Sequence, residues 1–252
     1  MDGVLWRGMQ PLPGLHDFFT HVFDKNIGFV LATNNSSKTR MNYVEKLAAL
    51  GVNGVQRSHI VTSGTATASY LQTKFPPGTR LFVVGGPGLK QILTEAGFRL
   101  VDDDADLVVC GIDTDLTYDK VSKATLLIRG GAGFIGTNPD TSFPAPEGLV
   151  PGAGSILALL EAASGQRPIV IGKPSRGMFE AALRQLQAAP EETLMIGDRI
   201  GTDIEGARAL GIRTALVMTG VEDEASLSAS QVQPDCVFEG LPDLLAAFTR
   251  GG

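Results

Sequence analysis

Short apolar runs alternate along the chain with longer segments in which apolar residues recur at helical spacing. The apolar runs, bounded by Gly, Asn, Asp or Pro, cover residues 28–35, 80–86, 106–113, 168–174, 193–198, 213–220 and 236–240. The segments with helical spacing cover residues 38–51, 89–97, 118–131, 177–189, 202–211 and 241–250. Short strands that alternate with amphipathic helices are typical of βαβ units. The pattern predicts an α/β fold whose core is a doubly wound, Rossmann-like parallel sheet.

Polar side chains gather where four of the expected strands end. They are Asp2-Gly3, Thr33-Asn34-Asn35-Ser36, Gly172-Lys173-Pro174, and Gly197-Asp198 followed by Thr202-Asp203. In open parallel sheets, functional residues lie in the loops beyond the carboxyl ends of the strands. Two clusters come before residue 40 and two after residue 170, so the stretch between them is expected to be an inserted domain. We predict a core of residues 1–70 and 168–252 and an inserted α/β domain of residues 71–167.

Composition and charge exclude several classes of function. The chain is 43% apolar and 19% charged, which is typical of a folded globular protein. No apolar run approaches the roughly 18 residues of a membrane span, and nothing resembles an export signal, so a cytoplasmic protein is expected. A formal charge of -6 without a basic patch argues against nucleic acid as a partner. Cys110 and Cys236 stand in apolar, strand-like runs and are predicted to be buried, reduced thiols.

The four polar clusters, taken in order, resemble the motifs of the haloacid dehalogenase superfamily. The phrases are D-G-V-L-W at Asp2, A-T-N-N-S-S around Thr33, G-K-P-S around Lys173, and G-D-R-x-x-T-D from Gly197 to Asp203. More narrowly, the chain is similar to subfamily IIA, with a C2-type cap between the second and third motifs. That subfamily includes p-nitrophenyl, nucleotide and phosphoglycolate phosphatases. G-I-D-T-D-L-T-Y, G-T-N-P-D and P-G-A-G-S-I extend the resemblance into the inserted domain, which would be the cap.

The resemblance implies a phosphatase that works through an aspartyl phosphate. In such enzymes the first Asp of an Asp-x-Asp motif attacks phosphorus, and the second protonates the leaving oxygen and later deprotonates water. Asp2 matches the second Asp, and its backbone carbonyl is also expected to reach the metal. The nucleophile would stand two residues earlier, outside the sequence given, so we expect the natural product to begin upstream.

The same expectation concerns stability. An upstream strand would be buried on both faces, and four or five aliphatic side chains in it amount to about 10 kcal/mol. That figure is comparable with a typical net stability of about 5 to 15 kcal/mol. The chain as given is therefore expected to fold poorly and to be unable to form the covalent intermediate. The alternative is a catalytically dead protein of the same fold, which keeps the phosphate cradle and binds without turnover.

Three consecutive residues and one lysine are candidates for binding phosphate. The Thr33 hydroxyl ends a buried strand and is expected to donate to a phosphate oxygen. Asn34 and Asn35 would add side-chain and backbone donors and open the next helix, whose N-terminus favours an anion. Lys173, held by Pro174, is a point charge on a flexible stem that suits bridging the nucleophile and the phosphate. For the T-N-N-S-S phrase alone, the alternative is a plain helix cap.

A late acidic pair is the candidate metal site. Asp198 is the expected ligand, with Asp203 as the second acid that binds or orients the ion and Asp2 contributing as above. Hard oxygen ligands without nearby His or Cys favour Mg²⁺ over zinc. The alternative for Thr202 and Asp203 is that they merely cap the following helix.

The cap is expected to select the substrate by closing over the core. By resemblance, Asp113, Asn138 and Asp140 are candidates for contact with the substrate, and turn formation by these Asx residues is the alternative. The resemblance implies a small phosphorylated metabolite as partner and a possible homodimer through the cap. A nicotinamide-dependent oxidoreductase is a further alternative based on the Gly-rich phrase at residues 83–90. Its glycine spacing does not match G-x-G-x-x-G.

Overall fold

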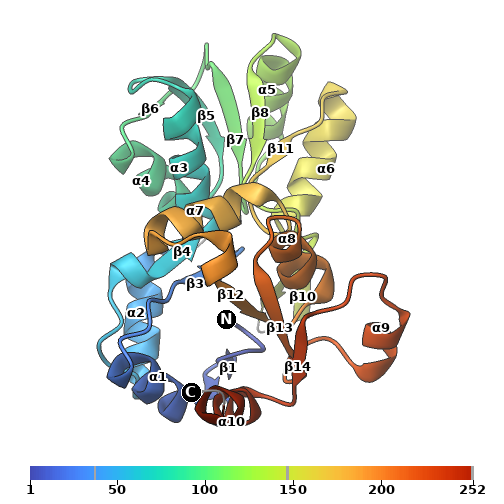
Figure 1. The fold of residues 1–252 in the computed structure, drawn as a ribbon. Helices are drawn as coiled ribbons and strands as arrows, with labels where there is room; N and C mark the ends of the chain where they lie inside the picture. The colour runs from blue at the N-terminus through green and yellow to red at the C-terminus, as the bar shows by residue number, and fades with distance from the viewer. Residues whose placement is uncertain (37, 146–147, 251–252) are drawn as a thin grey trace. The chain divides into compact units, whose positions relative to one another are not determined.

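The computed structural model describes residues 1–36, 38–145 and 148–250, so Ser37 of the T-N-N-S-S phrase lies outside the described residues. The chain forms two compact units (Figure 1). Unit 1 comprises Met1–Ala32, Arg40–Ile60 and Ala182–Gly252, and unit 2 comprises Thr33–Thr39 and Val61–Ala181. The predicted core and cap would assign residues 33–39, 61–70 and 168–181 to the core instead. The division into compact units does not show which segments would move as a cap. The predicted boundaries of the core and the cap therefore stay a prediction.

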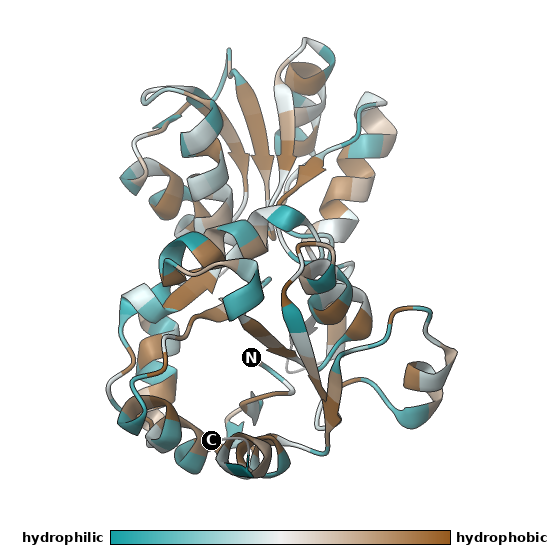
Figure 2. Cartoon of the chain, in the orientation of Figure 1, coloured by the Kyte–Doolittle hydropathy of each residue, from teal (hydrophilic) through white to brown (hydrophobic). Residues whose placement is uncertain are grey.

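Unit 2 contains a five-stranded sheet in the order β11-β8-β7-β5-β6, in which every pair is parallel. The strands are β5 (Arg80–Val84), β6 (Arg99–Leu100), β7 (Leu107–Cys110), β8 (Gly133–Gly136) and β11 (Ile169–Val170). Its helices are α3 (Ser63–Lys74), α4 (Pro87–Glu95), α5 (Tyr118–Arg129), α6 (Ala153–Ser164) and most of α7 (Arg176–Leu186). The central strand β7 is buried throughout, and Figure 2 shows the strands of this sheet as hydrophobic. A continuous apolar run is what a parallel strand covered on both faces requires.

The remaining strands form smaller sheets. In unit 1, β12 (Leu194–Gly197), β13 (Arg213–Val217) and β14 (Cys236–Phe238) form a parallel sheet. Two antiparallel pairs are β1 (Trp6–Arg7) with β2 (Gln10–Pro11), and β9 (Ser142–Ala145) with β10 (Gly148–Pro151). Strand β3 (Leu31–Thr33) pairs with β4 (Ile60–Thr62). The predicted α/β class with a parallel-sheet core is confirmed.

Unit 1 also holds five α-helices in its described part. They are α1 (Leu15–Asp24), α2 (Arg40–Ala49), α8 (Glu205–Arg208), α9 (Glu224–Ala229) and α10 (Leu241–Arg250). Short 3₁₀ turns cover Arg57–His59 and Pro190–Glu192, and a π turn covers Ile200–Ile204. The single helix predicted over residues 202–211 is therefore wrong in detail, because the π turn precedes α8. Throughout the described residues, every helix is too short or too polar to span a bilayer.

The two cysteines differ from one another. Both are free, as predicted. Cys110 is fully buried on β7, and burial raises the pKa of its thiol well above the usual range, with the Asp113 charge adding to the effect. Cys236 is exposed, so its predicted burial is wrong. The reason is that β14 is the last strand in the order of its sheet.

Helix α1 shows how unit 1 builds its core. Leu15, Phe18, Phe19 and Val22 recur at helical spacing and are all buried. The Phe19 ring makes edge contacts with Phe18, 5.6 Å between ring centroids. Trp6, the only tryptophan of the chain, lies in the same apolar cluster. The indole fluorescence therefore reports on the packing of unit 1.

Phe19→Ala should lower the free energy of unfolding of unit 1 by about 3 to 5 kcal/mol, because it leaves a cavity in a buried cluster. Phe23→Ala on the same helix is the matched control, since Phe23 is 39% exposed whereas Phe19 is 2% exposed. Urea unfolding followed by Trp6 fluorescence measures both. Equal losses for the two variants would contradict this assignment of the core.

Candidate active site

In unit 1, two carboxylates follow the end of β12. Asp198 comes directly after the strand and Asp203 lies in the π turn, and they are 5% and 3% exposed. Asp203 Oδ2 accepts hydrogen bonds from the backbone N of Asp198 at 3.2 Å and of Arg199 at 3.3 Å. Asp203 thus bonds backward along the chain and fixes the loop that carries Asp198. The alternative of a cap for the following helix does not describe this geometry.

Glycines surround both carboxylates. A Cβ on Gly3 would lie 2.7 Å from Asp198 Cγ, and one on Gly220 would lie 2.5 Å from the same atom. A Cβ on Gly197 would lie 2.7 Å from Asp203 Cγ. Contacts this short do not occur between real Cβ atoms and their neighbours, so only glycine fits at these three positions. The backbone consequently approaches the carboxylates as closely as it can.

Asp2 belongs to a turn tied to the loop after β13. The exposed Asp2 carboxylate accepts a hydrogen bond from Trp6 Nε1 at 3.2 Å. The Thr219 hydroxyl donates to the Gly3 carbonyl at 2.7 Å, and Arg7 donates to the Thr219 carbonyl at 2.7 Å. Since Gly3 also touches Asp198, unit 1 brings the segment of Asp2 together with the acidic pair.

In unit 2, Asn34 and Lys173 meet although 139 positions separate them. Asn34 Oδ1 accepts from the Lys173 backbone N at 2.8 Å, and Asn34 Nδ2 donates to the Lys173 carbonyl at 3.0 Å. Asn34 Nδ2 also donates to Asp140 Oδ1 at 3.1 Å. The Asn34 side chain is therefore engaged with protein groups. A contact of Asn34 with phosphate would therefore have to come from its backbone amide, and this contact stays a prediction.

Thr33 and Asn35 form a local turn. The Thr33 hydroxyl oxygen accepts from the Asn35 backbone N at 3.3 Å. The next helix, α2, begins only at Arg40. The expectation that Asn34 and Asn35 open a helix is therefore wrong, and no N-terminus of α2 stands beside them. Their predicted contact with phosphate depends on the turn itself.

Two of the three cap candidates, Asp113 and Asn138, make turns, as the alternative proposed. Asp113 Oδ1 accepts from the Asp115 backbone N at 3.0 Å, and Asn138 Oδ1 accepts from the Asp140 backbone N at 3.1 Å. The buried Asp113 carboxylate also pairs with the Lys120 ammonium at 3.1 Å. These bonds give all three residues a structural task. Their contact with substrate stays a prediction.

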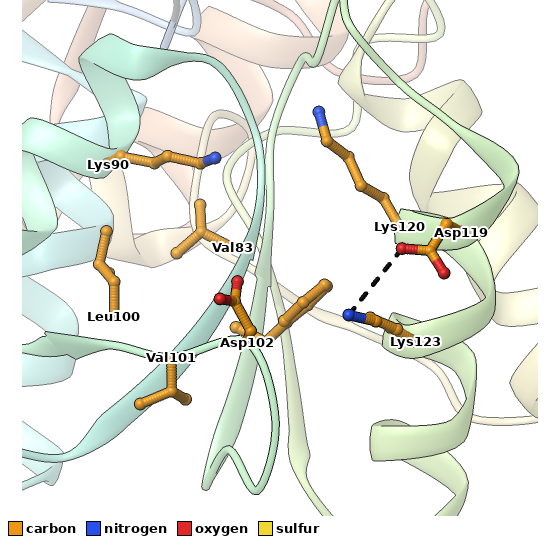
Figure 3. A pocket seen from close by; sticks show the side chains of 9 residues that line it. Val83, Lys90, Leu100, Val101, Asp102, Asp119, Lys120 and Lys123 are labelled. Carbon is orange, nitrogen blue, oxygen red and sulfur yellow. Dashed lines mark ion pairs between the residues drawn. The ribbon is translucent and has the colours of Figure 1, made fainter.

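A separate cavity of about 360 Å³ opens in unit 2 and is lined by residues of β5, α4, β6 and α5 (Figure 3). Three lysines surround it, of which Lys120 is held by Asp113 and by the Asp115 carbonyl at 2.7 Å. Lys123 pairs with Asp119 at 3.9 Å, as the dashed line in Figure 3 marks. None of the predicted site residues lines this cavity. Because its lysines are largely paired with acids, we do not assign the phosphate site to it.

Sequence reasoning missed several residues that shape these clusters. Ser63, at the start of α3, donates to the Asn34 carbonyl at 2.5 Å. Thr219 and Gly220 contact Gly3 and Asp198 as described above. The signal for all three was available: each follows an apolar run, I-V-T before Ser63 and A-L-V-M before Thr219. The rule that strand ends carry function applies to them as well.

The acidic pair suits a hard cation. Magnesium is commonly bound through one or two carboxylates and keeps several waters. Asp198 and Asp203 supply such oxygens, and the glycines around them let the backbone approach the carboxylates closely. Among the described residues, no group of three or more His, Cys, Asp or Glu is arranged to hold a metal. The two carboxylates therefore suit a magnesium ion, which needs few protein ligands, better than a metal whose ligands all come from the protein.

The fold and these clusters define an α/β protein with buried charged side chains at the carboxyl ends of its parallel strands. A model of haloacid dehalogenase-like hydrolases matches residues 1–99, and a second model of the same class of hydrolases matches residues 170–244. The chain belongs to the haloacid dehalogenase-like hydrolase family.

Relatives with named activities extend over almost the whole chain. It is 38% identical to dihydroxyacetone phosphatase of Corynebacterium glutamicum over 97% of this chain and 88% of that protein. Its fold matches 4-nitrophenylphosphatase of Thermotoga maritima with a TM-score of 0.92 at 37% identity, covering 98% and 94% of the two chains. Glycerol phosphate phosphatase of Mycobacterium tuberculosis, solved with magnesium, matches with a TM-score of 0.89 at 31% identity, covering 97% and 74%.

Asp203→Ala should lower the free energy of unfolding of unit 1 by about 1 to 3 kcal/mol, because two backbone amides lose their acceptor. Asp203→Asn keeps an acceptor oxygen and should remain close to the original protein. Asp24→Asn, an exposed change in the same unit, is the control for lost charge. Urea unfolding with Trp6 fluorescence compares them. An equal loss for Asp203→Asn would show that hydrogen bonding is not the role of this carboxylate.

Proposed function

We propose that the chain is a magnesium-dependent phosphatase that hydrolyses a phosphomonoester of a small metabolite. The observation that carries the proposal is the pair of buried carboxylates, Asp198 and Asp203, at the end of a parallel strand in a chain of this family. Relatives named for phosphatase activity on dihydroxyacetone phosphate, nitrophenyl phosphate and glycerol phosphate support it. Sugar, nucleotide and phosphoglycolate esters belong to the same chemical class.

The proposed reaction has two steps. A carboxylate two positions before Asp2, outside the sequence given, forms a bond to phosphorus while the bond from phosphorus to the ester oxygen breaks. Asp2 gives its proton to the departing oxygen. Asp2 then takes a proton from water as the water attacks phosphorus, which releases phosphate and restores the carboxylate. In this proposal Asp2 serves as both the acid and the base.

The other site residues act on charge and position. Lys173 places a positive charge on the phosphoryl oxygens, and Thr33, Asn34 and Asn35 donate hydrogen bonds to them. Asp198 would hold the magnesium ion, with Asp203 orienting its loop and the Asp2 carbonyl completing the protein ligands. When bound, the ion offsets negative charge on the phosphoryl group.

Phosphate release from p-nitrophenyl phosphate should require Mg²⁺ and should stop when EDTA removes it. The assay compares the chain as given with a version extended by the preceding codons of its gene, because the nucleophile is expected there. The extended protein should turn over, and the chain as given should release no phosphate. A folded, extended protein that releases no phosphate would contradict the proposal and favour a binding protein without turnover.

Lys173→Met should lower kcat in the extended protein by about 10²- to 10³-fold, because it removes the charge and keeps the length of the stem. Lys90→Met, on α4 beside the separate cavity, is the matched control and should leave kcat unchanged. Steady-state kinetics with p-nitrophenyl phosphate measures both variants. Similar kcat values for the two would remove Lys173 from the proposed reaction.

A further inference from the structure

We propose that Asn34 is a positioning residue that fixes Lys173 through its backbone, and that Asp140 holds the Asn34 amide in the orientation this requires. The inference rests on the proposed function, in which the Lys173 ammonium binds the phosphoryl group. It changes the task of two predicted site residues. Asn34 was expected to bind phosphate and Asp140 to bind substrate, whereas here both act on Lys173.

The Asn34 side chain pairs with Lys173 as one peptide group pairs with another. Its oxygen accepts from the Lys173 N at 2.8 Å, and its nitrogen donates to the Lys173 carbonyl at 3.0 Å. Strand β11 ends at Val170, so Lys173 lies beyond the ladder that would otherwise satisfy its backbone. Buried backbone groups need partners, and Lys173 is only 7% exposed. The Asn34 amide meets this need with a single side chain.

Asp140 determines which way the amide points. The second hydrogen of Asn34 Nδ2 is directed to Asp140 Oδ1, at 3.1 Å. A flipped amide would set its oxygen against the Asp140 carboxylate and its nitrogen against the Lys173 N–H. Both contacts would be repulsive, because a carboxylate only accepts and a backbone N–H only donates. The acid therefore selects the orientation that clamps Lys173.

The backbone of Asn34 is fixed as firmly as its side chain. Its carbonyl accepts from Asn138 Nδ2 at 2.8 Å and from the Ser63 hydroxyl at 2.5 Å. The clamp thus joins the end of β3, the start of α3, the loop of Asn138 and Asp140, and the loop of Lys173. These four segments come from different parts of unit 2. All of them are hydrogen-bonded at Asn34 or contain it, so Asn34 joins them.

Gly172 lets this junction form. A Cβ there would lie 2.9 Å from Asn34 Oδ1, 2.7 Å from Asn138 Cβ and 2.6 Å from the Thr137 carbonyl oxygen. Backbone atoms on one side and the clamp on the other leave no direction in which such a Cβ fits. Any side chain at this position would therefore push the Lys173 loop away from Asn34.

Fixing the backbone matters because the lysine stem is long and flexible. The ammonium can be held in one place only if its Cα is held first, and a misplacement of about 1 Å costs up to about 10²-fold in rate. Both donor hydrogens of the Asn34 side chain are used by protein groups, and its oxygen cannot donate to a phosphate anion. Asn34 consequently acts through Lys173 and not on the phosphate by its side chain.

The test uses the extended protein and four variants. Asn34→Ala removes the clamp, and Asn34→Asp keeps the acceptor for the Lys173 N–H but sets a carboxylate against Asp140. The double variant Asn34→Asp with Asp140→Asn restores a donor between positions 34 and 140. Gly172→Ala disturbs the clamp without altering Asn34. Matched controls are Asn53→Asp, at an exposed asparagine, and Gly28→Ala, where the nearest atom to a Cβ is 3.9 Å away.

Two measurements separate positioning from general stability. In turnover of p-nitrophenyl phosphate, kcat should fall about 10- to 100-fold in Asn34→Ala, Asn34→Asp and Gly172→Ala, with a smaller change in KM. The double variant should regain part of the loss seen in Asn34→Asp. In hydrogen exchange, the Lys173 amide should exchange about tenfold faster in Asn34→Ala and stay protected in Asn34→Asp. Both controls should match the original protein.

Each result decides a separate question. If kcat per folded molecule is unchanged in Asn34→Ala and Gly172→Ala, Asn34 is not a positioning residue. If the double variant recovers nothing, Asp140 does not orient the amide. If the original extended protein releases no phosphate, the proposed function is wrong. The exchange of the Lys173 amide then still tests the clamp, since an unchanged rate in Asn34→Ala overturns it.

Discussion

The site depends on how closely the backbone approaches its polar side chains. Four glycines make this approach possible: Gly3, Gly197 and Gly220 against the acidic pair, and Gly172 against Asn34. At each position a Cβ would overlap atoms that have no room to move. Buried carboxylates and amides need hydrogen bonds to compensate for lost water, and backbone groups at short range supply them without a flexible partner. The glycines thus convert strand ends into rigid sites at no cost in side-chain entropy.

The apolar pattern predicted the fold because the information is local. The continuous apolar run at residues 106–113 and the helical spacing at residues 118–131 correspond closely to β7 and α5. The same rule singled out Lys173 and Asp198 as candidates, since it needs only the position of each strand, and the structure shows both residues buried beyond β11 and β12. Thr219, Gly220 and Ser63 followed apolar runs too, but none of them stands in one of the four recognised motifs.

What the sequence could not reveal is the direction of each polar side chain. Asn34 and Lys173 are far apart in the chain, and only the folded loops decide that an amide meets a backbone rather than a ligand. Asp203 was recognised as part of the acidic pair, yet its bonds back to the amides of Asp198 and Arg199 follow from a π turn that no periodicity marks. For a similar reason, the expectation that Asn34 and Asn35 open the next helix placed the start of α2 too early, since it begins at Arg40. A polar phrase such as T-N-N-S-S can cap a helix, but it does not show how many irregular residues separate it from the first helical turn.

At position 34 an amide suits the proposed role of Lys173 better than a carboxylate would, because that role depends on the positive charge of the lysine. A carboxylate there would accept from the Lys173 N–H but could not donate to the Lys173 carbonyl, and it would face the carboxylate of Asp140. It would also bring a second negative charge, besides that of Asp140, close to the Lys173 loop. That carboxylate would compete with the phosphate for the Lys173 ammonium. A neutral side chain that both donates and accepts completes the Lys173 backbone and adds no negative charge to the loop. The amide therefore serves geometry and electrostatics together, which a charged residue at this position would not.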